Sequence, residues 1–140
     1  MSIRAARLLV VLGVGALSIA GMIGGQSPRP KPDLTVKLES TALLRPNQRI
    51  TITVTVKNDG GPAPASGCVV FVRNARPPRQ TMRTFKKAVR ALDPGDQYAF
   101  SLFIKLGLGL YEVTAVADPK KKISETDEAN NEARIWIVGK

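Results

Sequence analysis

Acidic and amide side chains gather near the end of this chain, between Asp118 and Asn131. Their oxygens are ligands of the kind that calcium takes, which makes four carboxylates calcium candidates: Asp118, Glu125, Asp127 and Glu128. The spacing is not that of an EF-hand loop, and three lysines at 120–122 place positive charge beside it. The alternative is a structural loop, because Asp and Asn side chains bond their own backbone in turns. Turn chemistry explains these residues without a metal, so we predict no cofactor.

Positive charge is concentrated in one segment that contains no acid, and these residues are candidates for binding a polyanion: Arg73, Arg76, Arg79, Arg83, Lys86, Lys87 and Arg90. The whole chain has a formal net charge of +10. A basic surface attracts polyanions, which outside the cytoplasm are anionic envelope polymers and lipid headgroups. The alternative is a solvated strand edge whose charges discourage edge pairing. Phe71 and Phe85 are too few aromatics for a platform that stacks bases, so no nucleic acid partner is expected.

The composition argues against an enzyme. The chain has no histidine, which excludes histidine-based triads and histidine metal sites and leaves Cys68 without its usual base. Cys68 is the only cysteine, so no disulfide forms within the chain. Because it lies in an apolar run that ends at Val72, we expect a buried hydrophobe rather than a reactive thiol. We therefore predict a non-catalytic protein with no catalytic residues.

Residues 1–25 have the features of a signal peptide. Arg4 and Arg7 precede an uncharged run, 8–25, whose most apolar part fits the ~7–15 residues of a signal-peptide core. The alternative is an uncleaved anchor, because the run just reaches the ~18 residues at which a membrane helix becomes possible. We expect a periplasmic, secreted or cell-surface protein. It would meet the membrane transiently through its signal peptide, or through an anchor at residues 8–25.

A proline-rich linker, residues 26–32, precedes the folded part. Pro28, Pro30 and Pro32 alternate with basic residues, and prolines this dense favour an extended, solvated chain. The remainder, residues 33–140, has the length of one domain and is close to the ~100 residues of an immunoglobulin-like sandwich. We therefore expect a single two-sheet core.

Alternation of apolar and polar residues predicts strands throughout this domain. The clearest run is 50–57, where isoleucine and valine alternate with threonine. The run 68–72 is apolar on both faces and predicts a central strand, whereas the basic run 81–87 predicts a short edge strand. Further strands are expected at 34–38, 98–104, 111–117 and 133–138. The sequence thus predicts an all-β, immunoglobulin-like β-sandwich of about seven strands.

Two aromatic residues refine this picture. Tyr111 begins the penultimate strand just after two glycines, which is where a tyrosine corner is expected, with its hydroxyl bonded to the preceding turn. Trp136 is the only tryptophan and alternates with Ile135 and Ile137, so we expect it to point away from the core.

Four short motifs, in order, resemble the CARDB family, the cell-adhesion-related domain of bacteria. They are Pro32 to Val36, Thr53 to Gly60, the turn Ala91 to Asp96, and the closing pattern Asp118-Pro119, Glu125, Glu128 and Asn130-Asn131. The resemblance covers 33–138. It implies a seven-stranded immunoglobulin-like sandwich in an exported protein, used as an accessory module, with no catalytic residues. An adhesion-type module would meet an envelope protein. A module that works through its basic segment would meet an anionic polymer or lipid.

Export gives the first testable prediction. Small residues at Ser18 and Ala20 fit a signal peptidase, so the mature protein should begin at Gly21, with Gln26 as the second choice. N-terminal sequencing of the secreted protein measures this directly. An intact Met1 on a protein retained in the cytoplasm would show that residues 1–25 do not direct export.

Overall fold

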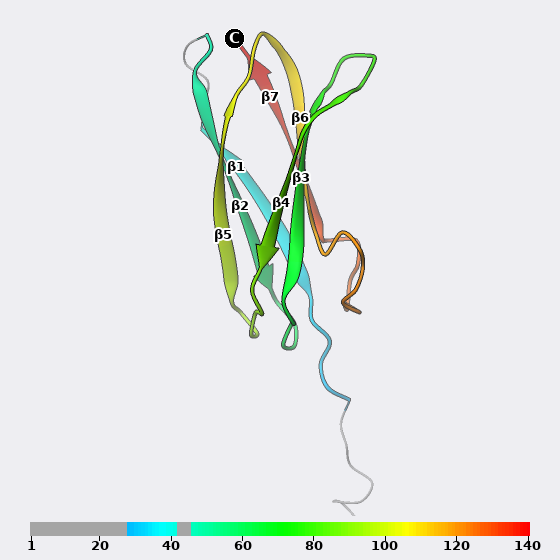
Figure 1. Ribbon diagram of the computed structural model, residues 1–140. Coiled ribbons are helices and arrows are strands. Elements are labelled where there is room, and N and C mark those ends of the chain that lie inside the picture. The colour runs from blue at the N-terminus through cyan, green and yellow to red at the C-terminus, as the bar shows by residue number, and fades with distance from the viewer. Residues whose placement is uncertain (1–27, 42–45) are drawn as a thin grey trace, which may run out of the picture.

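The computed structural model describes residues 28–41 and 46–140 and contains two antiparallel sheets packed as a sandwich (Figure 1). A three-stranded sheet has the order β1-β2-β5, and a four-stranded sheet has the order β4-β3-β6-β7. The strands are β1 (Leu34–Ser40), β2 (Arg49–Asn58), β3 (Ser66–Asn74), β4 (Thr81–Val89), β5 (Gln97–Lys105), β6 (Gly109–Ala117) and β7 (Glu132–Gly139). The predicted seven-stranded sandwich is confirmed. The predicted signal peptide lies outside the described residues.

No helix that is long and apolar enough to span a membrane occurs at residues 28–41 or 46–140. The part of the chain that the structure describes consists of strands and their connections.

Strand β2 is the centre of the smaller sheet, as its alternation suggests. Ile50, Ile52, Val54 and Val56 have no exposed surface, while the threonines between them lie on the outer face and are half-buried. The inner side chains pack against the corresponding row of the other sheet, which includes Val70, Val113 and Ala115. Period-two alternation therefore places every apolar side chain of β2 in the core.

In the four-stranded sheet, β3 is a central strand and β4 is an edge strand, as the sequence predicts. β3 pairs with both β4 and β6, whereas β4 pairs only with β3 and forms an edge. Nearly all of β4 is exposed, apart from half-buried Phe85 and buried Val89. A register shift between Val72 and Arg73 marks an irregularity near one end of this pair.

The side chain of Asn58, at the end of β2, forms four hydrogen bonds to backbone groups. Its Oδ1 accepts hydrogen bonds from the amides of Asp33 and Gly60, each at 3.1 Å. Its Nδ2 donates to the carbonyl oxygens of Gly61 at 2.7 Å and Leu92 at 3.0 Å. The side chain has no exposed surface. One amide thus joins the start of β1, the β2–β3 connection and the β4–β5 connection.

The last residues of the linker are hydrogen-bonded to this same end of the sandwich. The carbonyl oxygen of Lys31 accepts from Gly61 at 2.8 Å, and that of Pro32 accepts from Thr126 at 2.9 Å. Gly61 allows the close approach, since a Cβ there would collide with the carbonyl oxygen of Pro30. We call this the linker end: residues 28–33, the β2–β3 and β4–β5 connections, and residues 118–131 (Figure 1).

The two aromatic predictions have different outcomes. Trp136 points away from the core and is 53% exposed, as predicted. Tyr111 is buried, and its ring lies against Gly109. Its hydroxyl, however, forms no hydrogen bond with another described residue. The predicted tyrosine-corner bond is therefore not seen, and the ring packs on glycines instead.

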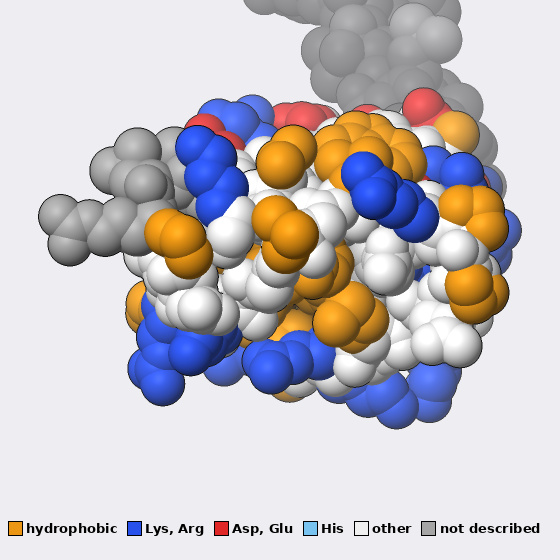
Figure 2. Space-filling model, turned by 90° about the horizontal axis from the view of Figure 1, so that it is seen from above, with side chains coloured by type: hydrophobic (Ala, Val, Ile, Leu, Met, Phe, Trp, Pro, Cys, Tyr) orange, Lys and Arg blue, Asp and Glu red, His pale blue; other side chains and the backbone are white. Residues whose placement is uncertain are grey.

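Exposed apolar side chains lie at the opposite end of the sandwich. We call this the far end: the β3–β4 loop, the β5–β6 turn and the neighbouring strand ends. Figure 2 looks onto it and shows apolar and basic side chains spread across it, with acidic ones only at one edge. The large exposed hydrophobic residues of the described chain all lie there: Met82, Phe103, Leu108, Trp136 and Val138.

The assignment of faces on β2 gives the second prediction. Val54→Asp places an unpaired charge in the core and should cost more than about 4 kcal/mol, which is enough to unfold a marginally stable domain. Thr55→Asp is the control, because Thr55 lies on the outer face opposite Lys37 and Ala99. Thermal melting followed by circular dichroism compares the two. A Val54→Asp variant that melts like the wild type would contradict this packing.

Candidate functional site

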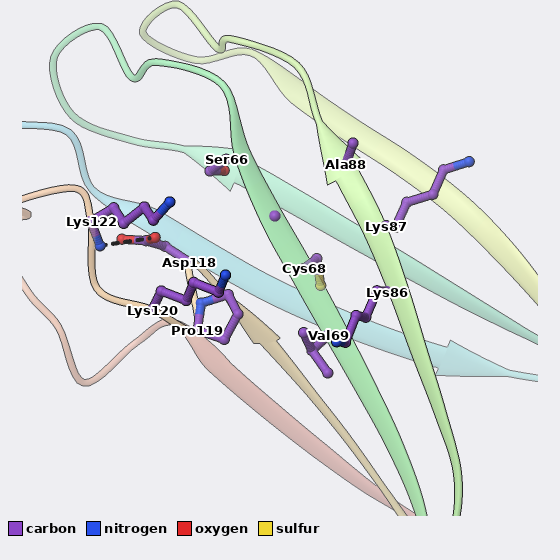
Figure 3. A pocket seen from close by; sticks show the side chains of 11 residues that line it. Ser66, Cys68, Val69, Lys86, Lys87, Ala88, Asp118, Pro119, Lys120 and Lys122 are labelled. Atoms are coloured by element: carbon purple, nitrogen blue, oxygen red, sulfur yellow. Dashed lines mark hydrogen bonds between the residues drawn. The ribbon is translucent and has the colours of Figure 1, made fainter.

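A cleft of about 380 Å³ opens at the linker end, over the start of β3. Its walls are the end of β4 on one side and residues 118–122 on the other (Figure 3). The size is within the range of about 300–1,000 Å³ that is usual for small-ligand sites. The cleft is lined by small and apolar residues together with four lysines: Ser66, Gly67, Cys68, Val69, Lys86, Lys87, Ala88, Asp118, Pro119, Lys120 and Lys122.

Gly67 keeps the floor of the cleft open. It pairs with Ala88 across β3 and β4, on the same face of the sheet as Val69. A Cβ at this position would meet only the carbonyl oxygen of Lys87, at an ordinary contact distance of 3.8 Å. A larger side chain at residue 67 would therefore project into the cleft without displacing the backbone.

Three lysines converge on this cleft. Figure 3 shows Lys120 and Lys122 reaching over it from one wall and Lys86 from the other, whereas Lys87 points away. None of the four forms an ion pair with another described residue. The cleft thus combines an apolar floor with unpaired cations at its rim, an arrangement that favours a ligand with an anionic group.

Asp118 is the one acid in the lining, and its carboxylate is occupied by the backbone. Its two oxygens accept hydrogen bonds from the amides of Lys122, at 3.1 Å, and Ile123, at 2.8 Å. The residue is buried. Asp118 therefore shapes the loop that carries Lys120 and Lys122 and does not neutralise either ammonium group through an ion pair.

The basic segment is distributed along the whole length of β4 and does not form one patch. Arg76 and Arg79 are exposed in the loop at the far end, and Lys86 and Lys87 lie at the cleft. Arg83 is exposed on β4 between these groups. The segment therefore contributes to two separate surfaces at opposite ends of the domain.

The first and last cations of the segment have structural contacts. Arg73 is half-buried with its guanidinium 5.2 Å from the centre of the Phe71 ring, which is a cation–π distance. Nη1 of Arg90 lies 3.6 Å from Oδ2 of Asp96, and the guanidinium group also donates hydrogen bonds to the carbonyl oxygens of Ala91 and Gln97. Arg90 therefore holds the β4–β5 connection.

Glu125 joins the acidic closing loop to the start of β1. Its Oε2 accepts from the amide of Leu34 at 2.8 Å, and its Oε1 accepts from Nδ2 of Asn131 at 2.8 Å. Burial raises the pKa of the Glu125 carboxyl group, and the hydrogen bonds from Leu34 and Asn131 oppose that rise. This carboxylate thus fixes the chain entering β1 against the loop.

The calcium candidates do not come together as a metal centre. Asp127 accepts from the amide of Ala129 at 2.8 Å, and Glu128 accepts from the amide of Glu125 at 3.2 Å. Within residues 28–41 and 46–140, no group of three or more His, Cys, Asp or Glu side chains is placed to hold a metal ion. The carboxylates of Asp118, Asp127 and Glu128 instead accept hydrogen bonds from backbone amides of the loop.

Cys68 is a core residue next to the cleft. It has 1% of its surface exposed, and burial raises the pKa of its thiol to about 12. A thiol with this pKa is not ionised at neutral pH and is a poor nucleophile. The apolar interpretation of Cys68 is confirmed.

The cleft could not be predicted from the sequence. The lysines at 120–122 argue there only against a cation site, whereas the structure places Lys120 and Lys122 opposite Lys86. Three adjacent lysines and a glycine at the start of a central strand were the available signals. Nothing in the sequence alone shows that these segments flank one cavity.

Comparison with known proteins identifies the domain. The CARDB family model matches residues 31–134. This chain belongs to the CARDB family. The family consists of non-catalytic modules, and the match agrees with the resemblance of the four sequence motifs. No curated protein sequence matches the chain.

Solved CARDB structures share the fold. The crystal structure of a CARDB domain from Pyrococcus furiosus, in complex with di-metal ions, has a TM-score of 0.65 at 22% identity and covers 81% of this chain and 97% of its own. A solution structure of a domain from a protein described as a cell surface protein of Methanosarcina acetivorans has a TM-score of 0.57 at 19% identity, covering 79% and 93%. At these identities the comparison shows the fold alone.

The raised pKa of Glu125 gives the third prediction. The ordinary value is 4.5, and a higher pKa in the folded protein means that the folded state binds this proton more tightly than the unfolded state. The group's contribution to stability is therefore fully present below the unfolded pKa and is lost as pH rises through the folded pKa. Glu125→Gln removes this titration.

Urea unfolding of both proteins between about pH 4 and about pH 7 measures this effect. The free energy of unfolding of the wild type, minus that of Glu125→Gln, should fall as the pH rises. A difference that stays constant, or that increases, would contradict a raised pKa at Glu125.

Proposed function

We propose that this chain is an exported, non-catalytic, adhesion-type binding module of the cell envelope. We further propose that it holds anionic groups of envelope polymers in the lysine-lined cleft at its linker end. The observation that carries the proposal is the convergence of Lys86, Lys120 and Lys122, without ion pairs, on one cavity. Phosphate and carboxylate groups are the chemistry that such a rim attracts.

An envelope location is supported by the N-terminal segment and by the family. Residues 1–25 have the charge and apolar pattern of a signal peptide, and one structural relative is a domain of a protein described as a cell surface protein. A non-catalytic role is supported by the absence of histidine and by the buried, un-ionised thiol of Cys68. Together these features favour binding rather than chemistry.

The fourth prediction tests the cleft with inorganic polyphosphate as the probe. Lys86, Lys120 and Lys122 changed together to glutamine should weaken binding by at least about tenfold, since one charge-assisted hydrogen bond is worth about 1.5–3 kcal/mol. Gly67→Val should also weaken binding, because it fills the cleft and keeps the net charge. Isothermal titration at low ionic strength measures both effects on residues 26–140, which hold all seven strands.

The matched control removes the same amount of charge at the far end, by changing Arg76, Arg79 and Lys105 to glutamine. This variant should retain most of the affinity for polyphosphate. Equal losses in the two triple variants, together with wild-type binding by Gly67→Val, would mean that net charge alone attracts the polymer. The cleft would then not be the binding site.

A further inference from the structure

The far end differs from the rest of the surface in both charge and hydrophobicity. Its segments, residues 46–51, 72–82, 103–110 and 136–139, contain no Asp or Glu. They hold five cations, and none of the five forms an ion pair with a described residue: Arg49, Arg73, Arg76, Arg79 and Lys105. The same segments carry the large exposed hydrophobic residues, so unpaired cations and exposed apolar side chains occur together at this end of the sandwich.

Two carboxylates lie on the strands near this end, and both already have partners. Glu39, near the end of β1, lies 2.8 Å from Nζ of Lys37. Glu112, near the start of β6, is buried and lies 3.7 Å from Nε of Arg134. Neither carboxylate therefore forms an ion pair with one of the five cations of the far end. An anionic partner would complement this positive charge.

The apolar side chains of the far end point in different directions. Phe103 is 67% exposed on the outer face of the three-stranded sheet, because it alternates with buried Ile104. Val138 is 63% exposed on the outer face of the four-stranded sheet, beside Trp136. Leu108 is 88% exposed in the turn that joins the two sheets. They surround the end of the sandwich and do not form one flat patch.

This arrangement decides between two kinds of anionic partner. A rigid protein interface needs a contiguous apolar core with a polar rim, and the opposite outer faces of a sandwich do not provide one. The interfacial region of a bilayer accepts separate apolar side chains, favours tryptophan at the headgroup level, and attracts nearby Lys and Arg when its lipids are anionic. Charge and shape together therefore favour a lipid surface.

We propose that the far end docks on an anionic lipid bilayer. Leu108 enters the interface at the tip, Phe103 and Val138 flank it, and Trp136 lies at the headgroup level. The exposed cations Arg76, Arg79 and Lys105 meet the lipid phosphates. This surface is separate from the cleft, which lies at the linker end, and it extends the membrane contact beyond the N-terminal segment that the sequence indicates.

The position of the linker determines whether the anchored or the cleaved form of the protein can dock through its far end. Residues 31–33 are held to the opposite end by hydrogen bonds, and a strand of nine residues, such as β5, spans about 30 Å. An uncleaved anchor at residues 8–25 would therefore hold the far end away from the membrane that contains it. The proposal therefore concerns a cleaved form that lacks this anchor, and residues 26–140, the shorter of the two predicted mature forms, are used to test it.

Trp136 provides the readout, because it is the only tryptophan of the chain and lies on the proposed surface. Residues 26–140 are titrated with vesicles of phosphatidylethanolamine and phosphatidylglycerol, and with vesicles of phosphatidylcholine alone. The anionic vesicles should shift the emission of Trp136 to shorter wavelength, and brominated lipid should quench it. Sedimentation of the vesicles measures binding independently.

Two variants at the far end should weaken vesicle binding, with folding checked by thermal melting. Leu108→Ser should lower the partition coefficient at least about fivefold, because it removes an inserted apolar side chain. Arg76, Arg79 and Lys105 changed together to glutamine should lower it at least about tenfold. The control changes Lys86, Lys120 and Lys122 to glutamine and should alter it by less than about threefold, because these lysines lie at the other end.

Three results would overturn the proposal. The first is no binding to anionic vesicles. The second is binding without a change in the Trp136 emission, which would place the membrane against another surface. The third is an equal loss in the two triple variants, which would mean that net charge alone drives adsorption. Since the cleft variant is tested separately with polyphosphate, failure of the lipid proposal is distinguishable from failure of the cleft.

Discussion

The buried amide of Asn58 is the interaction on which the linker end depends. It is fully enclosed, and its oxygen and nitrogen each make two hydrogen bonds to backbone groups, which belong to Asp33 just before β1, to the β2–β3 connection and to the β4–β5 connection. Leaving a buried polar group without a partner costs about 1–3 kcal/mol, and here several backbone groups rely on one side chain. The three segments are therefore fixed relative to one another, and Pro32 and Asp33 are held in place as β1 begins.

Glu125 extends the same constraint to the closing loop. It bonds the amide of Leu34, directly after the residue that Asn58 holds, and so joins residues 118–131 to the start of β1. Asp118 then folds the loop back on itself through the amides of Lys122 and Ile123. The acidic side chains thus stabilise the backbone that presents the lysines, and this accounts for an acidic loop that forms one wall of a basic cleft.

The sequence was sufficient to predict the fold because its strands have short-range patterns. The alternation of β2 gave its buried face, and the basic residues of β4 gave its position at an edge. The role of Asn58 was not predictable, because a turn motif containing asparagine does not show that the side chain will be enclosed by three distant segments. The predicted hydrogen bond of the Tyr111 hydroxyl to the preceding turn is wrong, because no described residue forms it. The glycines near Tyr111 instead provide a surface on which its ring packs.

The candidate sites were predictable only in part. The cations between Arg73 and Arg90 are evident in the sequence, but a strand nine residues long carries them from one end of the domain to the other. The pairing order β4-β3-β6 then brings Lys86 close to the loop that follows β6. Strand order depends on contacts between distant residues, and local patterns do not contain it. The structure therefore replaces one predicted basic surface with two, each with a different apolar component.

The two ends of this CARDB domain are proposed to bind different anionic partners. Amide chemical-shift mapping by NMR, on one labelled sample of residues 26–140, tests it most directly. Polyphosphate should shift the amides of residues 66–69, 86–88 and 118–122, while anionic lipid nanodiscs should shift or broaden those of residues 103–110 and 136–139. Perturbation of the same residues by both ligands, or uniform perturbation of all basic residues, would contradict the claim.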